Sequence, residues 1–337
     1  MSARVLISIV TYNSARHIEA CFQSLREQAY ENFRISVWDN ASVDETRSIL
    51  ESRRDLIGSI HFSDRNAGFC EAHNRMIESA ECDYVLVLNP DVRLTPLFLE
   101  KIIGGMERDP GAGSATGKLY RHPDGRILDT TGIYFTPSQR HLDRGSNEID
   151  TGQYDKAEYV FGASGAAALY RREMLEEVRD GNEFFDESFF AYREDADLAW
   201  RAQWMGWRCL YVPEAIGYHE RRVLPENRFR LPDPVNMHSF KNRFLLRIKN
   251  MDAGTYARFI VPITLRDAAA LLYVVLREWS SLPAIPRLIA AFPRAWASRK
   301  SIRSRRRISP REIRSWFSYK PVAREIRSQA PPAKPGA

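Results

Sequence analysis

Residues 5–13 read VLISIVTYN, a short stretch rich in Val and Ile that runs directly into a threonine, a tyrosine and an asparagine. A run of this kind, ended by polar residues, is typical of a buried β-strand. Three similar runs follow in the first part of the chain, separated by longer stretches of helical character: Phe33–Trp38, Ile60–Phe62 and Tyr84–Leu88. Strands that alternate with helices at this spacing predict βαβ units, so the expected fold class is α/β with a mostly parallel sheet.

The second part of the chain has a different character. Residues 111–153 are rich in Gly, Asp and Pro, and a strong helix, Asp195–Met205, and a buried strand, Cys209–Val212, are predicted after them. Beyond Glu220, apolar segments carry regularly placed arginines, as amphipathic helices do. We therefore expect three regions: an α/β domain over 1–220, a basic helical extension over 221–328 and a disordered tail over 329–337.

The charge distribution supports this division. The 337 residues carry a net charge of +6, but residues 1–220 carry −12 and residues 221–337 carry +18. Halves of opposite sign indicate different partners. The acidic half suits chemistry on a small molecule with a metal ion, whereas the basic half suits a polyanion.

Two features indicate where the protein works. Its four cysteines form no CxxC pair, which argues against a zinc cluster and favours a reducing compartment. The apolar run near the N-terminus is too short for a secretory signal.

The apolar stretch Tyr256–Leu276 contains Pro262 and a charged Arg266-Asp267 pair, so it predicts an interfacial amphipathic helix rather than a spanning one.

Polar groups end all four predicted strands. They are Thr11-Tyr12-Asn13, Asp39-Asn40, Asn66-Ala67-Gly68 and Asn89-Pro90-Asp91. Each could be ordinary turn chemistry, since Asn, Asp and Gly end strands in many proteins. Together they indicate a ligand, because open parallel sheets bind ligands beyond the carboxyl ends of their strands.

Five motifs in this order give the chain a resemblance to a known family. They are SIVTYN at 8–13, DNASVD at 39–44, NAGF at 66–69, LNPD at 88–91 and EDADL at 194–198, the last followed by Trp200-Arg201. The sequence over about 4–220 resembles the inverting glycosyltransferases of family 2, which have the Rossmann-like GT-A fold. The resemblance implies an enzyme that transfers a sugar from a nucleotide-diphosphate donor to a hydroxyl acceptor.

The resemblance also implies roles for individual residues. The nucleotide-sugar is expected to be bound by Thr11, Tyr12, Asn13, Asp39, Asn66, Gly68 and Asn89, with Asp39 accepting a hydrogen bond from a pyrimidine base. The family's Asp-x-Asp motif corresponds to residues 89–91, with Asn89 in place of its first aspartate. This leaves Asp91 as the main anionic ligand of a Mg²⁺ or Mn²⁺ ion, and His219 matches a late histidine that often completes the metal site.

Asp195 is the expected general base, and Glu194 competes for that role. An acceptor hydroxyl is a poor nucleophile, so a positioned carboxylate that removes its proton is worth about 10²–10⁴ in rate. The alternative for Asp195 is an acid that stabilises a helix N-terminus. Asp197 and Arg201 lie four residues apart and are expected to pair across one helical turn.

The donor and the partners follow from the same resemblance. The pattern looks most like bacterial rhamnosyltransferases that extend lipid-linked cell-surface polysaccharides, which implies dTDP-L-rhamnose; a UDP-hexose donor stays open. A nucleotidyltransferase would need a Gly-rich, basic phosphate loop early in the chain, and residues 11–14 do not form one.

The basic half suggests a further partner, an anionic membrane surface. Lys241, Arg243, Arg247 and Lys249 interleave with apolar residues, as in a helix that lies in a bilayer interface. We therefore expect a cytoplasmic protein attached peripherally to the inner face of the plasma membrane. The rival from another class is a non-catalytic polyanion- or RNA-binding protein, although nucleic acid is not the expected partner.

Overall fold

A computed structural model describes residues 3–122, 124–221 and 233–326. Its first part shows the predicted alternation of strands and helices. The elements are β1 Val5–Thr11, α1 Ala15–Arg26, β2 Phe33–Asp39, α2 Thr46–Ser52, β3 Ser59–Phe62, α3 Gly68–Glu78 and β4 Tyr84–Leu88. All four predicted strands are therefore present.

The middle of the chain adds shorter strands and the acidic helix. These elements are β5 Val92–Leu94, α4 Phe98–Arg108, β6 Ala112–Arg121, β7 Leu128–Thr130, β8 Ile133–Phe135, β9 His141–Asp143, β10 Glu158–Val160, β11 Ala167–Arg171, α5 Arg172–Val178, the 3-10 helix η1 Glu187–Phe189, α6 Glu194–Trp204 and β12 Arg208–His219. The predicted helix Asp195–Met205 and the strand Cys209–Val212 are confirmed as α6 and part of β12.

One large sheet organises this part of the molecule. Its strands run in the order β10-β12-β6-β11-β4-β1-β2-β3, with β5 beside β12 and β7 beside β6. The pairs β1–β2, β1–β4, β2–β3 and β6–β12 are parallel. Strand β11 is inserted antiparallel between β4 and β6. The predicted α/β fold with a mostly parallel sheet is confirmed.

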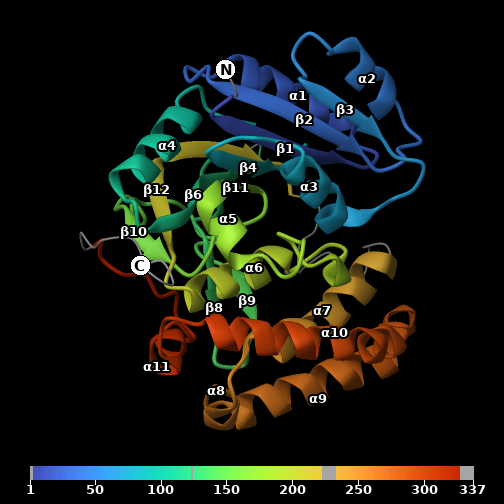
Figure 1. Ribbon diagram of the computed structural model, residues 1–337, viewed down its shortest axis with the longest axis vertical. Helices are drawn as coiled ribbons and strands as arrows, with labels where there is room; N and C mark the ends of the chain where they lie inside the picture. The colour runs from blue at the N-terminus through green and yellow to red at the C-terminus, as the bar shows by residue number, and fades with distance from the viewer. Residues whose placement is uncertain (1–2, 123, 222–232, 327–337) are drawn as a thin grey trace.

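The central strands are buried because helices cover the sheet on both sides (Figure 1). All five residues of β4 are buried, and six of the seven residues of β1 are. This burial explains why these strands read as nearly continuous apolar runs rather than alternating ones. Trp200, Trp204 and Trp207 pack into the same core and are not available to stack on a sugar.

The C-terminal region is helical, as the sequence predicted. Its elements are α7 Asp233–Asn250, α8 Ala253–Arg258, α9 Ile260–Arg277, the 3-10 helix η3 Trp279–Ser281, α10 Ala284–Arg305 and α11 Pro310–Arg314. Figure 1 shows these helices gathered at one end of the molecule, with α9 on the outside. Among the described residues, every helix is too short or too polar to cross a membrane.

The charged residues of α7 do not lie where the sequence suggested. Lys241, Arg243, Arg247 and Lys249 are all buried. Helix α7 packs between α6 and α10 and therefore has no broad face left for a membrane. The prediction that these four side chains meet a bilayer is wrong, because each is enclosed by protein.

Candidate functional site

The ends of the central strands meet at one edge of the sheet. Strands β1, β2 and β4 are parallel, so their carboxyl ends lie together, and the antiparallel β11 begins at the same edge. Backbone hydrogen bonds join these ends: the Asn40 amide donates to the Thr11 carbonyl at 2.8 Å, and the Asn89 amide donates to the Ala166 carbonyl at 2.9 Å. The structure thus brings the predicted nucleotide residues to one place.

Asp39 lies at the centre of the first part of the site and is fully buried. One carboxylate oxygen accepts hydrogen bonds from the hydroxyls of Thr11 at 2.9 Å and Ser42 at 2.5 Å. The other accepts from the Ser42 amide at 3.1 Å and from Nε of Arg47 at 2.9 Å. A carboxylate has about four acceptor positions, and protein donors fill them here. Asp39 therefore holds Thr11, Ser42 and Arg47 together at the wall of the site.

The loop after β1 is fastened to the loop after β2. Asn13 adopts a left-handed backbone conformation with φ of 50°, and its side-chain oxygen accepts a hydrogen bond from the Val43 amide at 2.9 Å. Its own amide donates to the Ser42 hydroxyl at 2.9 Å. Asn tolerates this conformation better than most residues. Tyr12 is left exposed at the rim, where an aromatic ring can meet a ligand.

Gly68 begins helix α3 with φ of +81°. A Cβ atom at this position would lie 2.6 Å from a ring carbon of Phe190 and 2.7 Å from its carbonyl oxygen. That carbonyl accepts hydrogen bonds from the amides of Phe69 at 2.7 Å and Cys70 at 3.1 Å. Glycine is therefore required at position 68 because the start of α3 lies close to Phe190 of the same chain. Asn66, exposed beside it, accepts a hydrogen bond from the Gly68 amide at 2.9 Å.

Asp91 and His219 lie together, as the metal prediction requires. Oδ1 of Asp91 is 3.3 Å from Nε2 of His219, whose Nδ1 contacts Oδ2 of Asp129 at 2.7 Å. Burial lowers the pKa of His219, but the carboxylates of Asp129 and Asp91 raise it to about 9. Burial raises the pKa of Asp91, and His219 more than offsets this, so the net shift is downward. Asn89 is half-buried at the start of the same turn.

These groups fit one side of a divalent cation's coordination shell. Oδ1 of Asp91 is buried and faces Nε2 of His219 at 3.3 Å, so one ion could be held between the two atoms. The Asp129 contact fixes the orientation of His219, as carboxylates do behind metal-binding histidines. Within the described part of the chain, no three His, Cys, Asp or Glu side chains form a complete metal cluster. A cation here would need further ligands, which donor phosphates can supply.

Asp195 stands at the first turn of α6, next to the start of β11. Its Oδ2 accepts a hydrogen bond from the Gly165 amide at 3.0 Å, and its Oδ1 accepts from the Ala196 amide at 2.7 Å. Burial raises the pKa of Asp195. The Ala166 carbonyl accepts a hydrogen bond from the Asn89 amide, so the contact of Asp195 with the neighbouring Gly165 places Asp195 at the same sheet edge as Asn89.

Glu194 is more deeply buried than its neighbour. Its Oε2 has no hydrogen-bond partner among the described residues. Burial, and then the negative charge of Asp195, raise the pKa of Glu194 well above its usual range. Two adjacent carboxyls in different surroundings tend to take different protonation states. Burial raises the pKa of both carboxyls here, and it raises that of Glu194 well above its usual range.

The segment before α6 has an unusual backbone. Phe190, Tyr192 and Arg193 all have positive φ, between 66° and 74°. Residues other than glycine rarely adopt this conformation, and where they do it often serves a functional site. Asn242 of α7 stabilises this segment, because its side-chain amide donates hydrogen bonds to the carbonyls of Phe189, Ala191 and Tyr192.

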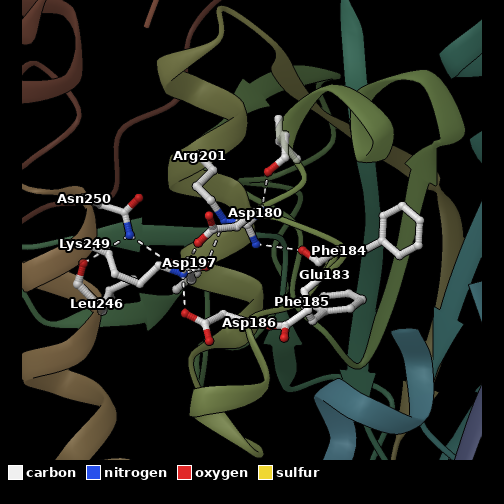
Figure 2. A network of polar contacts seen from close by, with 12 residues as sticks. Asp180, Glu183, Phe184, Phe185, Asp186, Asp197, Arg201, Leu246, Lys249 and Asn250 are labelled. Carbon is white, nitrogen blue, oxygen red and sulfur yellow. Dashed lines mark hydrogen bonds and ion pairs between the residues drawn. The ribbon is translucent and has the colours of Figure 1, made fainter. Parts of the chain in front are cut away.

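A buried charge cluster lies behind α6 (Figure 2). Nε of Arg201 donates to Oδ2 of Asp197 at 2.9 Å, which confirms the predicted pair one helical turn apart. Lys249 of α7 contacts Oδ2 of Asp186 at 2.5 Å and Oδ2 of Asp197 at 3.0 Å. Asn250 donates to Oδ1 of Asp197 at 2.7 Å. Asp180, 4.0 Å from Nζ of Lys249, and Arg294, 3.7 Å from Oδ1 of Asp186, extend the cluster.

Sequence reasoning missed three of the residues that shape the site. Asp129 follows an unremarkable Leu in a Gly- and Asp-rich stretch, so nothing in the pattern separates it from a turn residue. Phe190 resembles any core aromatic. Lys249 looked like part of a surface basic stripe, although its neighbour Asn250, a polar residue at the end of an apolar helix, was a signal of an interior contact.

The chain is similar in sequence to a known family and to several characterised proteins. The model of the family described as glycosyl transferase family 2 matches residues 6–179. An N-acetylglucosaminyl-diphospho-decaprenol L-rhamnosyltransferase from Mycobacterium tuberculosis is 29% identical in an alignment of length 242 that covers 63% of this chain and 74% of that protein. The O-antigen chain rhamnosyltransferase WbaN from Salmonella anatum is 25% identical over 82% of this chain and 90% of its own.

Solved structures show the same fold. Residues 1–349 of S. aureus TarS in complex with UDP-GlcNAc superpose with a TM-score of 0.56 at 16% identity, covering 94% of this chain and 93% of that one. The mannosyltransferase PcManGT from Pyrobaculum calidifontis, in complex with GDP-Man and Mn²⁺, gives a TM-score of 0.50 at 20% identity over 90% of this chain and 80% of its own.

Proposed function

The chain belongs to glycosyl transferase family 2, and from this premise we propose that it is an inverting glycosyltransferase acting on a lipid-linked or cell-surface polysaccharide acceptor. The observation that carries the proposal is the meeting of Asp91, His219 and Asp195 at the edge where the parallel strands end. Asp91 and His219 can hold a diphosphate there through a metal ion, while Asp195 can receive a proton from the acceptor hydroxyl.

The nucleoside end of the donor would lie against the loops after β1, β2 and β3. Tyr12, Asn13 and Asn66 offer a ring and amide groups at the rim, and Thr11, Asp39 and Gly68 form the wall behind them. Because the Asp39 carboxylate is occupied by Ser42, Thr11 and Arg47, a base would bind it by displacing one of these donors. Asn89 would approach the diphosphate from the end of β4.

Asp91 and His219 would hold a Mg²⁺ or Mn²⁺ ion between the protein and the donor diphosphate. A divalent cation bound there supplies positive charge that stabilises the departing nucleoside diphosphate. Two solved structures with the same fold contain Mn²⁺: the PcManGT complex and GalNAc-T7 with UDP and GalNAc. Asp129 would keep the His219 ring turned toward the ion through its 2.7 Å contact.

Asp195 would act as the general base. Its carboxylate would accept the proton of the acceptor hydroxyl while that oxygen attacks the anomeric carbon of the sugar. The bond from this carbon to the diphosphate oxygen breaks at the same time, and the electron pair leaves with the nucleoside diphosphate. Attack opposite the leaving group inverts the anomeric configuration. Glu194, whose pKa burial raises well above its usual range, would lie beside it.

For the donor we propose dTDP-L-rhamnose, with a UDP-hexose as the alternative. Two relatives named as rhamnosyltransferases support rhamnose. The fold neighbour TarS, solved with UDP-GlcNAc, keeps the alternative open. The name of the mycobacterial relative specifies a diphospho-decaprenol acceptor, which supports a lipid-linked acceptor. For the place of the reaction we propose the cytoplasmic, inner face of the plasma membrane.

We also propose that residues 1–220 form the catalytic GT-A domain and that 221–328 attach it to an anionic membrane. The contacts of α7 with α6 mean that this extension also supports the catalytic helix. The non-catalytic RNA-binding alternative has less support, because several C-terminal arginines bond to backbone carbonyls of the protein. Arg299 donates to Ile248, and Arg305 donates to Glu177 and Arg179.

A donor screen tests the proposal. Titration calorimetry of the full chain with dTDP-L-rhamnose, UDP-glucose and UDP-GlcNAc, each with and without Mn²⁺, should show metal-dependent binding of one nucleotide-sugar. Nuclear magnetic resonance of the product should then show the anomeric configuration opposite to that of the donor. Retention of configuration would refute the single displacement, and nucleic-acid binding without any donor binding would favour the rival class.

A further inference from the structure

Helix α9 is apolar on both of its faces. Its inner face buries Ile263 and Val274 against the protein. On the opposite face, Val261, Leu265, Leu272 and Leu276 follow one another at intervals of four, seven and four residues, which an α-helix of 3.6 residues per turn brings into one row. Leu265 is 68% exposed and Leu272 is 59% exposed. A helix that is apolar on both faces normally has a partner on each.

Helix α10 carries a second row of the same kind. Ile285, Ile289, Phe292 and Trp296 are spaced by four, three and four residues and are all exposed. The rings of Phe292 and Trp296 stack with centroids 5.8 Å apart. Trp279, in the turn between the two helices, is 71% exposed. Soluble surfaces rarely show so many large apolar side chains together unless they serve an interaction.

A groove joins the two helices. It has a volume of roughly 350 Å³ and is lined by Ala268 and Leu271 of α9, by Ile285 and Leu288 of α10, and by Phe240 and Phe244 of α7 beneath them. In Figure 1 the two helices lie next to each other at the end of the molecule away from β1–β3. Ile285 belongs both to the exposed row of α10 and to the groove, and Leu271, which is 46% exposed, lines the groove and precedes Leu272 of the α9 row. We call the groove and the two exposed rows the α9–α10 face.

The charges around this face are of one sign. Residues 253–305 contain nine Lys or Arg and two acids. Neither acid is exposed: Asp267 pairs with Arg247 at 2.6 Å, and Glu278 is buried and bonded to Ser281. Arg258, Arg277, Lys300 and Arg303 are exposed. Apolar rows with a tryptophan, bordered by exposed cations, are the signature of a helix that lies in a bilayer interface.

We propose that the α9–α10 face is the membrane-docking surface, with its apolar rows inserted at the headgroup boundary and its cations against anionic lipid headgroups. This deepens the membrane attachment proposed above and rests on it, but it does not depend on the sugar chemistry. It also moves the contact away from α7, whose basic residues are buried, to the two helices that follow. Charge complementarity favours an anionic bilayer over a second copy of this chain, which would bring like charges together.

Vesicle co-sedimentation of the full chain tests the proposal. The wild-type protein should bind vesicles of phosphatidylcholine with phosphatidylglycerol and bind phosphatidylcholine alone less well, because the cations need anionic headgroups. The double variant Leu265→Gln/Leu272→Gln should lower the partition coefficient by about tenfold or more, since two leucines lose their apolar burial. Ile149→Gln is the matched control: Ile149 is exposed but lies outside the C-terminal helices, so binding should be unchanged.

Three results would overturn the proposal. They are absence of wild-type binding to anionic vesicles at low salt, binding by the double variant equal to that of the wild type, and a concentration-dependent dimer that the double variant abolishes. Circular dichroism and a melting temperature equal to that of the wild type show that the fold of the double variant is intact. A protein that binds vesicles but transfers no sugar would refute the proposed enzyme and leave the docking surface standing.

Discussion

The Nζ atom of Lys249 lies 3.0 Å from Oδ2 of Asp197, and both side chains are fully buried. Asp197 belongs to the acidic helix α6, whereas Lys249 belongs to α7, 52 positions later. Burial lowers the pKa of Lys249, but Asp186 and Asp197 raise it overall, so the ammonium stays charged. The C-terminal extension thus supplies a positive charge that pairs with a buried acid of helix α6.

Lys249→Met should strongly destabilise the protein. Removing one partner of a buried ion pair typically costs about 3–5 kcal/mol, because the remaining charge stays buried and uncompensated. Urea unfolding followed by circular dichroism would measure the loss. Lys300→Met, at an exposed position of α10, is the control and should change the free energy of unfolding by less than about 0.5 kcal/mol. An equal loss of unfolding free energy in the two variants would contradict the stabilising role of the buried charge cluster.

The same contact predicts the behaviour of fragments. A fragment of residues 1–250 retains Lys249 and Asn250, whereas a fragment of residues 1–232 leaves Asp186 and Asp197 without them. We expect the longer fragment to unfold cooperatively and the shorter one to aggregate or to unfold at a clearly lower urea concentration. Equal stability of the two would show that residues 1–220 need no help from α7.

Asp195→Asn should abolish transfer while leaving donor binding intact. The amide keeps an oxygen for the Gly165 hydrogen bond but cannot accept the acceptor proton, so kcat should fall by at least about 10²-fold. Stopped assays with a matched acceptor would give kcat, and calorimetry would give donor affinity. Wild-type turnover by this variant would show that another group is the base.

The pH dependence of the wild-type enzyme should reflect the surroundings of Asp195. Burial raises its pKa, and only the ionised form can accept a proton. Activity should therefore be full at high pH and decline, as the pH falls, at values above the usual carboxylate range. A profile of kcat/KM against pH, with circular dichroism at each pH to exclude unfolding, checks the position of the acid limb. An acid limb near pH 4 would contradict the raised pKa.

Asp129→Asn should weaken metal binding although Asp129 itself is not proposed as a ligand. Its carboxylate holds Nδ1 of His219 at 2.7 Å, and loss of such an outer contact typically lowers metal affinity about 10–100-fold. Titration of Mn²⁺ into the protein with saturating donor would measure the change. Asp124→Asn is the control, because Asp124 is exposed in the turn before β7. Unchanged Mn²⁺ affinity in the Asp129 variant would show that Asp129 does not support metal binding.

Gly68→Ala should destabilise the protein by more than about 1 kcal/mol, because a side chain at a positive φ is strained and the Cβ would meet Phe190 at 2.6 Å. The matched control is Gly104→Ala within α4, where the Cβ meets only the flexible end of Arg108 at 3.3 Å. Alanine there should be neutral or stabilising, because it favours helix. Thermal unfolding of both variants distinguishes the two positions, and equal melting temperatures would remove the proposed constraint.

Local sequence signals were sufficient for the catalytic fold. The runs of Val and Ile at 5–10 and 84–88 predicted buried strands, and the polar residues after them marked the edge where Thr11, Asp39 and Asp91 now lie. The spacing and the types of the apolar residues identify such strands, because a buried strand is built from a continuous run of apolar residues. The short strands β9 and β10 were harder to predict, because three-residue segments carry little pattern.

The sequence by itself determined the α/β architecture, the acidic and basic halves, and the order of the motifs that reach the site. Only the tertiary structure decided which charges face inward. Lys249 and Asp129 look like surface residues in the sequence, yet packing between segments far apart in the chain buries both and pairs them with Asp197 and His219. A charged side chain tolerates burial only where a partner meets it, and that partner is fixed by long-range contacts rather than by neighbouring residues.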